Sequence, residues 1–100
     1  MAVLNGNEID EALAALPGWA HEDGKLTKTF RFGSFKEAMS FLVRVGMHAE
    51  EQEHHPEIFN VYSTVRLGLC THDAGDRVTE KDVTLARTIE RFNWLERGTD

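Results

Sequence analysis

The sequence EEQEHHPEIFNVY, residues 50–62, contains the point at which a helix gives way to a strand. Pro56 disfavours helical geometry in the residue before it, so the helix that leads into this stretch cannot continue past His55. The run that follows, IFNVY at residues 58–62, is rich in β-branched and aromatic residues and is typical of a strand. Two adjacent histidines, His54 and His55, therefore lie in the connection between a helix and a strand.

The chain before this stretch predicts an amphipathic helix. Ser34 and Glu37 mark its start, because an S-x-x-E capping box satisfies backbone donors that the first turn leaves free. Apolar residues then recur at steps of three and four, which is the spacing of one helix face. They are Phe35, Ala38, Leu42, Val45 and Ala49. This stripe is expected to belong to the core.

The chain after it predicts a second strand and another helix. Residues 64–71, TVRLGLCT, alternate between two faces, and a tight turn around Ser63 must join them to the preceding strand. One face holds Val65, Leu67 and Leu69, and the other holds Arg66, Gly68, Cys70 and His72. Thr79 and Asp82 form a second capping box and open a helix. Its inward residues are Val83, Ala86, Ile89 and Phe92.

The N-terminal part predicts a helix and a hairpin. Residues 7–16, NEIDEALAAL, have apolar residues at helical spacing, and Pro17-Gly18 ends the pattern. Two extended runs, WAHE and KLTKTFRF, flank Asp23-Gly24, a pair that favours a two-residue turn with positive φ. One face of the second run holds Leu26, Phe30 and Phe32, with Lys28 as the exception.

The predicted order is helix, strand, strand, helix, strand, strand, helix. Strands joined by short hairpins, with helices between the pairs, indicate a four-stranded antiparallel sheet with helices packed on one face. The sequence therefore predicts an α+β fold. Because 100 residues are about the size of one domain, residues 1–100 are expected to form a single domain.

Composition narrows the classes of function. The net charge of −6 would repel a phosphate backbone, so no direct nucleic-acid binding is expected. Cys70 is the only cysteine, so an intrachain disulfide is impossible and no oxidising compartment is required. The first residues do not resemble a signal peptide, and no apolar run approaches the roughly 20 residues of a membrane span. We expect a cytoplasmic protein without a membrane segment.

Three histidines are the candidates for chemistry. His54, His55 and His72 all lie at ends of predicted elements, and the 17 positions from His55 to His72 suit a strand and its returning hairpin partner. Imidazole, with an unperturbed pKa of about 6.5, can act as an acid or a base near neutrality. A capping or surface role for the pair is the alternative. His21 and His48 are assigned no role.

A metal site is a rival interpretation. Cys70 and His72 place sulfur and imidazole on the same side of a strand, and zinc accepts such ligands. Adjacent His54 and His55, however, cannot easily point at one ion, and the familiar zinc spacings of cysteine and histidine are absent from the sequence. We therefore expect no metal.

The spacing of the polar residues resembles a known family. Glu50-x₃-His54-His55-Pro56-x₅-Tyr62-x₉-His72-x₉-Asp82 is similar to the signature of the pterin-4a-carbinolamine dehydratases. The segments HHPE, FNVY, THDAG and TEKD also look like family segments, in the same order. The likeness extends from LPGW, near the first predicted strand, through the last helix.

The resemblance implies a reaction. Members of the family dehydrate 4a-hydroxytetrahydropterin, the form that aromatic amino-acid hydroxylases leave behind, to quinonoid dihydropterin. The elimination needs an acid for the departing hydroxyl and a base for the proton on N5, and it needs no cofactor or metal. The resemblance implies His54, His55 and His72 as catalytic residues, with His54 and His72 as the main proton carriers. It implies substrate binding by Glu50, Glu53, Pro56, Thr71, Asp73, Ala74 and Asp82.

The sequence departs from the family pattern in three places. Ile58 stands where tryptophan is common, Cys70 stands where serine is frequent, and the loop at 73–81 is one residue longer, with Asp76 and Arg77 at the insertion. These departures concern affinity and substrate range more than the type of reaction.

The resemblance also implies partners. A homodimer or homotetramer and a functional link to an aromatic amino-acid hydroxylase are expected. Some relatives act instead as dimerisation cofactors of a homeodomain transcription factor, so a non-catalytic interaction role is the second class of function. Trp94 and Leu95, expected to be exposed, are candidates for an oligomer contact.

Overall fold

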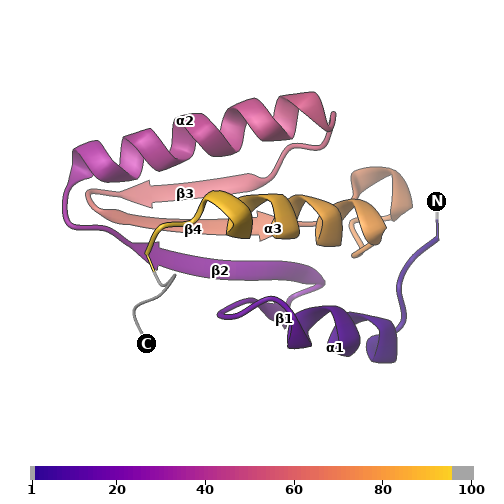
Figure 1. The fold of residues 1–100 in the computed structure, drawn as a ribbon. Helices are drawn as coiled ribbons and strands as arrows, with labels where there is room; N and C mark the ends of the chain where they lie inside the picture. The colour runs from indigo at the N-terminus through magenta and orange to yellow at the C-terminus, as the bar shows by residue number, and fades with distance from the viewer. Residues whose placement is uncertain (1, 96–100) are drawn as a thin grey trace.

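The computed structural model describes residues 2–95, within which three α-helices and four strands confirm the predicted α+β fold. The elements in chain order are α1 (Gly6–Ala14), β1 (Ala20–Glu22), β2 (Lys25–Arg31), α2 (Phe35–Glu51), β3 (Glu57–Val61), β4 (Thr64–Leu69), the short 3-10 helix η1 (His72–Ala74) and α3 (Glu80–Phe92). Figure 1 shows α2 and α3 running roughly along the direction of the strands.

The sheet is antiparallel throughout, with strand order β1-β2-β4-β3. Leu26 pairs with Leu69 and Phe30 with Val65, so these four side chains share one face, and all are buried. On the opposite face Thr29 pairs with Arg66, whose side chain is exposed. The helices therefore cover one face of the sheet, as predicted.

Both hairpin turns use left-handed backbone. Asp23 has φ 52° and Gly24 has φ 78°, which confirms the two-residue turn with positive φ expected of an Asp-Gly pair. In the turn between β3 and β4, Tyr62 has φ 52°. This second turn has no glycine, so the sequence marks it less clearly.

The ends of α2 and α1 differ from the predictions in detail. At the start of α2 the Ser34 hydroxyl accepts the N–H of Glu37, but the Glu37 carboxylate accepts the N–H of Gly33 rather than that of Ser34. The first helix begins one residue earlier than expected, because Asn5 and Glu8 form a capping box there. The capping box of Thr79 and Asp82 is present at α3.

Helix α2 ends before the limit set by Pro56. Glu53 is left-handed, with φ 52°, and its N–H donates to Glu50 O at 3.1 Å, while the His54 N–H donates to Ala49 O at 3.0 Å. These two bonds form a Schellman motif, which usually has glycine at the left-handed position. The chain therefore turns back immediately after the helix, and this reversal directs His54 towards the interior.

An aromatic cluster fills one part of the core. Phe41 packs against Phe30 with ring centroids 4.7 Å apart and against Phe32 at 5.0 Å. Trp94 adds a ring 5.4 Å from that of Phe32, although 44% of Trp94 stays exposed. Leu95 was expected to be exposed, but it is partly buried against this core.

Lys28, the polar exception on the buried face of β2, is neutralised within the protein. Its Nζ lies 2.8 Å from Glu90 Oε2 and 2.7 Å from Pro17 O. The indole N–H of Trp19 donates to the same Glu90 oxygen. A side chain at Gly18, where φ is +82°, would lie 2.8 Å from Lys28 Cε. Glycine is therefore required beside the lysine on both conformational and steric grounds.

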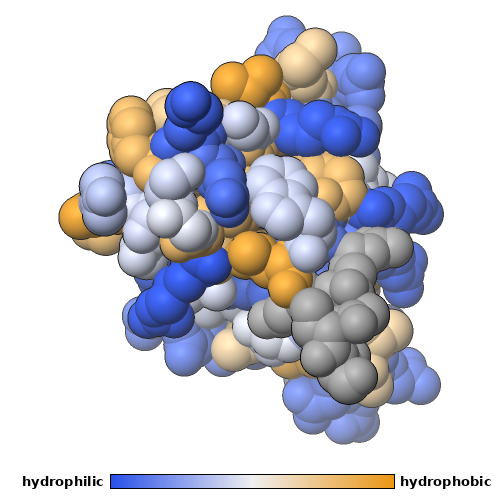
Figure 2. All heavy atoms as spheres, turned by 60° about the vertical axis from the view of Figure 1, so that its left-hand side comes forward, coloured by the Kyte–Doolittle hydropathy of each residue, from blue (hydrophilic) through white to orange (hydrophobic). Residues whose placement is uncertain are grey.

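Several large apolar side chains remain on the surface. On β3, an edge strand, and the following turn they are Ile58, Phe59, Val61 and Tyr62, and on α2 they are Phe35, Val43 and Met47. On the face shown in Figure 2, apolar side chains form several separate groups with hydrophilic ones between them. Within residues 2–95 no helix is both long and apolar enough to cross a lipid bilayer.

Candidate active site

The three candidate histidines meet in one hollow. Its volume is about 350 Å³, and it lies where the start of β3 and the end of β4 come together. The pairing of Glu57 with Gly68 explains the convergence, because residues just before β3 and residues just after β4 must lie at the same end of the sheet. The lining residues of this histidine hollow are Glu53, His54, His55, Cys70, Thr71, His72, Asp73 and Lys81.

His54 is held from behind by a buried carboxylate. Its Nε2 lies 2.5 Å from Asp82 Oδ1, and the residue is 8% exposed. The other oxygen of Asp82 accepts the Thr71 hydroxyl at 2.9 Å and the Thr79 N–H at 2.8 Å. Asp82 is fully buried. The two donors from Thr71 and Thr79 and the imidazole of His54 therefore surround its two oxygens in place of water.

This network determines which nitrogen of His54 carries a proton. An ionised Asp82 only accepts, so the His54 nitrogen that faces it, Nε2, must donate. Nδ1 has no hydrogen-bond partner within residues 2–95, yet no buried side-chain nitrogen or oxygen there lacks one, so Nδ1 must reach the surface. In the neutral ring, Nδ1 is then an unprotonated nitrogen that can accept a proton from a ligand.

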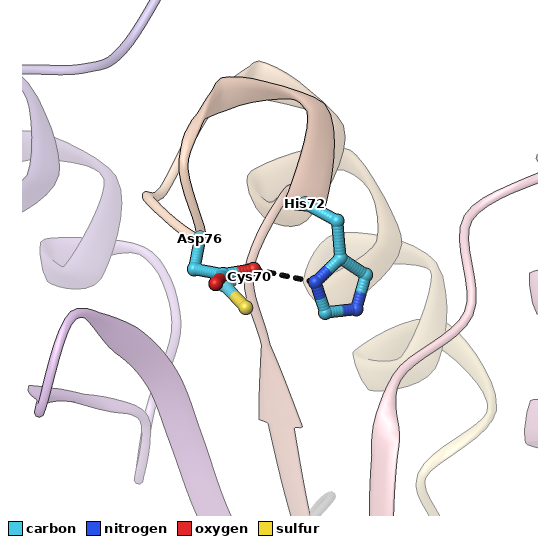
Figure 3. A group of neighbouring side chains, drawn as sticks. All are labelled: Cys70, His72 and Asp76. Carbon is cyan, nitrogen blue, oxygen red and sulfur yellow. Dashed lines mark hydrogen bonds and ion pairs between the residues drawn. The ribbon is translucent and has the colours of Figure 1, made fainter.

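His72 also pairs with an aspartate, but at the surface. Its Nδ1 lies 2.5 Å from Asp76 Oδ1, and the two side chains are 75% and 66% exposed. Figure 3 shows the Asp76 carboxylate against the imidazole ring, with Cys70 next to it. Asp76 is left-handed, with φ 59°, directly after left-handed Gly75. This backbone reversal brings Asp76 back to His72.

His55 is the most weakly held of the three. Its Nε2 lies 2.9 Å from Glu50 Oε1, and both side chains are largely exposed. A second histidine–glutamate contact lies within α2, where His48 Nδ1 is 3.2 Å from Glu51 Oε1. The contact with Glu50 can orient His55 beside the hollow, although water competes with it.

The predicted substrate-binding residues fall into two groups. Glu53, Thr71 and Asp73 line the histidine hollow together with the three histidines. Glu50, Pro56, Ala74 and Asp82 are not among its lining residues. Glu50 contacts His55 instead, and Asp82 contacts His54 from the interior. For Glu50 and Asp82, these contacts with histidines suit a supporting role.

Two neighbours of the hollow were missed by the sequence reasoning. Lys81 lines it and also lines an adjoining hollow of about 370 Å³, which shares His54. A lysine in the first turn of a helix is unfavourable to the helix dipole, and this was an available signal. Asp76 was noted only as part of a longer loop, because a contact across left-handed residues cannot be read from spacing.

Cys70 supplies the only sulfur of the hollow. Burial raises the pKa of its thiol above the ordinary value, and the negative charge of Asp76 acts in the same direction. The group therefore remains a neutral thiol near pH 7.

Comparison with known proteins identifies the family of this chain. The family model of pterin 4 alpha carbinolamine dehydratase matches residues 2–92. The chain belongs to this family. The resemblance drawn from the spacing of histidines, proline and aspartate is thereby confirmed over nearly the whole sequence.

Individual pterin carbinolamine dehydratase relatives cover the chain almost completely. One from Opitutus terrae, which carries that name provisionally, is 53% identical over 93% of this chain and 96% of its own. One from Novosphingobium aromaticivorans with the same provisional name is 48% identical over 92% and 97%. A crystal structure of a transcriptional coactivator/pterin dehydratase from Brucella melitensis matches with a TM-score of 0.84 at 39% identity, covering 90% of this chain and 97% of the other.

Proposed function

We propose that this protein is a lyase that dehydrates 4a-hydroxytetrahydropterin to quinonoid dihydropterin, and so supports the recycling of tetrahydropterin. The observation that carries the proposal is the histidine hollow, which gathers His54, His55 and His72 from two separate segments. Its volume, about 350 Å³, is near the lower end of the range of roughly 300–1,000 Å³ for small-molecule sites. A bicyclic pterin is a ligand of suitable size.

His54 is the better candidate for the base. The elimination removes the proton from N5 and the hydroxyl from carbon 4a, and the unprotonated Nδ1 of His54 can take the N5 proton. Because Nε2 donates to Asp82, the imidazolium formed in this step stays paired with a buried carboxylate. The proton acquired by His54 is therefore compensated without rearrangement of the site.

His72 is then the candidate for the acid. Its Nδ1 faces Asp76, so a protonated ring has Nε2–H left to donate to the departing hydroxyl, which leaves as water. The carbon–oxygen bond breaks as electrons from N5 form the new double bond. His55 is assigned to binding and orientation. Pro56, Thr71, Asp73 and Ala74 border the pterin together with Glu53, and Glu50 and Asp82 support the histidines.

The direct test is an assay of the purified protein with 4a-hydroxytetrahydropterin. The rate of dehydration should exceed the uncatalysed rate in proportion to protein concentration, since general acid–base catalysis typically contributes 10²- to 10⁴-fold. A rate equal to that of buffer alone would refute the proposal.

The rival metal interpretation makes a different prediction. If the histidines carry protons, protein treated with a chelator should retain full dehydratase activity. Elemental analysis before and after chelation would check the result. Stoichiometric zinc, with activity lost on its removal and restored on its return, would contradict the acid–base mechanism.

We also propose that the protein is a homodimer or homotetramer. The edge strand β3 and its turn expose Phe59 at 58%, Val61 at 56% and Tyr62 at 72%. Edge strands with apolar side chains tend to pair with another chain, and a second copy is the simplest partner. Light scattering at micromolar concentration should show a dimer or tetramer; a monodisperse monomer of 11.3 kDa would refute this.

A non-catalytic role as an interaction cofactor is the second candidate, and the likeness to the transcriptional coactivator/pterin dehydratase from Brucella melitensis supports it. Loss of activity on histidine replacement with unchanged partner binding would separate the two roles. A cytoplasmic location and a link to an aromatic amino-acid hydroxylase remain predictions.

A further inference from the structure

One cluster of side chains beside the histidine hollow contains a thiol, which the proposed acid–base reaction does not use. One ligand atom each from Cys70, His72 and Asp76 lies within 4.8 Å of the other two, so that sulfur, nitrogen and oxygen face a common point. Figure 3 shows the three side chains converging from the end of β4, the start of η1 and the loop that follows. The third group beside Cys70 and His72 is thus Asp76, and not His54 or His55.

The backbone holds this cluster together. The Thr71 N–H donates to Arg77 O at 2.8 Å, and the Asp76 N–H donates to Thr71 O at 3.0 Å. The Gly75 N–H donates to His72 O at 3.0 Å. These bonds close the loop at both ends, so the three side chains are brought together by the fold and not by a chance surface contact.

We propose that Cys70, His72 and Asp76 form a binding site for a divalent transition-metal ion, specifically Zn²⁺. Zinc is bound in proteins by thiolate, imidazole and carboxylate ligands, at roughly 2.0–2.3 Å and in tetrahedral geometry. Harder ions such as Mg²⁺ require more oxygen ligands than this cluster offers. A water molecule would complete the four ligands of the zinc ion.

The geometry needs only a small adjustment. Ligand atoms around a tetrahedral zinc ion lie about 3.3–3.8 Å from one another, as follows from the metal–ligand distances. The cluster already meets an upper limit of 4.8 Å, and the His72 and Asp76 side chains are largely exposed and can rotate. Binding releases the Cys70 thiol proton to solvent, and the neutral His72 ring that binds through Nδ1 keeps its proton on Nε2.

Zinc at this site would inhibit the enzyme. With Nδ1 bound to the metal, the His72 ring can no longer gain a proton while keeping its ligand bond, so it cannot act as the acid. This inhibitory half rests on the proposed function; metal binding itself does not.

The binding half is tested with cobalt, whose bond to a thiolate gives a charge-transfer band in the near ultraviolet. Titration of the full chain with Co²⁺ should produce this band, saturating at one ion per chain, and Zn²⁺ but not Mg²⁺ should abolish it. Cys70→Ser should remove the band, and Asp76→Asn should weaken binding by about tenfold or more. A band of equal affinity in Asp76→Asn, or no saturable band in the unaltered protein, overturns the site.

A matched control is available on α2. Glu51→Gln removes the carboxylate from another histidine pair, His48 Nδ1 with Glu51 Oε1 at 3.2 Å, which is not part of the cluster of Cys70, His72 and Asp76. This variant should bind Co²⁺ as the unaltered protein does. If Glu51→Gln weakens the cobalt band as much as Asp76→Asn does, the carboxylate effect is general surface charge and the site is overturned.

The inhibitory half is tested by the ratio of dehydratase rates with and without one equivalent of Zn²⁺. This ratio should fall several-fold in the unaltered protein, recover on addition of a chelator, and stay near one in Cys70→Ser. A cobalt band without any change of rate overturns inhibition alone. If the protein has no dehydratase activity at all, the proposed function and the inhibition fail together, whereas the cobalt titration still decides the site.

Discussion

The two histidine–aspartate pairs beside the hollow are alike in contact but opposite in environment. In each pair an imidazole nitrogen lies 2.5 Å from a carboxylate oxygen. The side chains of His54 and Asp82 are 9% and 0% exposed, whereas those of His72 and Asp76 are 75% and 66% exposed. The comparison shows that a histidine–aspartate contact has a different effect when it is buried than when water can replace it.

In the buried pair the aspartate fixes the histidine. Asp82 has no access to water, so its carboxylate depends on its contacts with His54, Thr71 and Thr79. Removal of any one of these partners leaves a buried acceptor without a hydrogen bond. In the exposed pair, water can substitute for either partner, and surrounding ions screen the charges. We therefore expect the His54 ring to be held in one tautomer and orientation, and the His72 ring to be free to change its protonation state.

The largest effect is expected from removing either ring. His54→Ala and His72→Ala should each lower turnover by roughly 10²-fold or more, as expected for the loss of a general base or acid. Steady-state kinetics of dehydration would measure the loss, with His21→Ala, which alters an exposed histidine outside the hollow, as the control. Turnover close to normal in both variants would mean that the histidines are structural.

The same two variants should separate in stability. His54→Ala leaves Asp82 without one of its buried donors, so the free energy of unfolding should fall by about 1–3 kcal/mol. His72→Ala removes an exposed side chain and should stay within about 0.5 kcal/mol of the unaltered protein. Urea denaturation measures both. Equal stability losses would show that the buried and exposed pairs do not differ as described.

The combination of both replacements reports whether the rings act together. If His54 and His72 take part in one proton-transfer step, the double variant should lose less than the product of the two single losses, because groups that work as a unit are non-additive. Losses that multiply would instead indicate two independent contributions.

The next effect concerns the tautomer of His54. In Asp82→Asn the amide oxygen can satisfy Thr71 and Thr79, but its NH₂ then faces His54 Nε2 and forces that nitrogen to accept. The proton moves to Nδ1, which no longer acts as a base. Turnover should therefore fall by roughly 10²-fold or more, as when His54 itself is removed.

Asp76→Asn is the matched control for this change. Its neighbour His72 is exposed to water and can keep either tautomer, so dehydration should slow by about fivefold or less, the equivalent of ~1 kcal/mol. Comparable losses in Asp82→Asn and Asp76→Asn would refute the assignment of distinct roles to the two aspartates. The ring orientation of His54 can be followed by NMR of the imidazole nitrogens.

The contrast between the pairs also marks the limit of sequence reasoning. Local signals identified the Asp23-Gly24 hairpin, the Pro56 boundary and the capping box at Thr79, because each depends on residues a few positions apart. The spacing of the family motif predicted that His54, His55 and His72 share one site. Asp82, however, was expected among the substrate-binding residues, and its use by a histidine 28 positions away is a tertiary contact that spacing does not reveal.

Asp76 was beyond reach for a different reason. Its contact with His72 depends on two consecutive left-handed residues, and an aspartate in that conformation is uncommon enough that no local pattern predicts it. The end of α2 is similar, because Glu53 takes the left-handed position where glycine is usual. Sequence reasoning therefore failed in two ways, at the tertiary contact of Asp82 with His54 and where the backbone departs from the common regions.

The smallest effect, and the finest test of the comparison, is the salt dependence of the coupling within each pair. A double-mutant cycle of His72→Ala and Asp76→Asn should give a coupling free energy of about 0.2–1 kcal/mol at low salt, because both charges are solvated. In 1 M NaCl, where the Debye length is about 3 Å, this coupling should approach zero. The cycle of His54→Ala and Asp82→Asn should give a larger coupling, about 0.5–3 kcal/mol, that changes little with salt because ions cannot reach the buried oxygen. Urea denaturation of the four single variants, the two double variants and the unaltered protein at both salt concentrations gives all the values. If the His54 coupling also disappears in high salt, water and ions reach Asp82, and the distinction between a fixed and a free histidine fails.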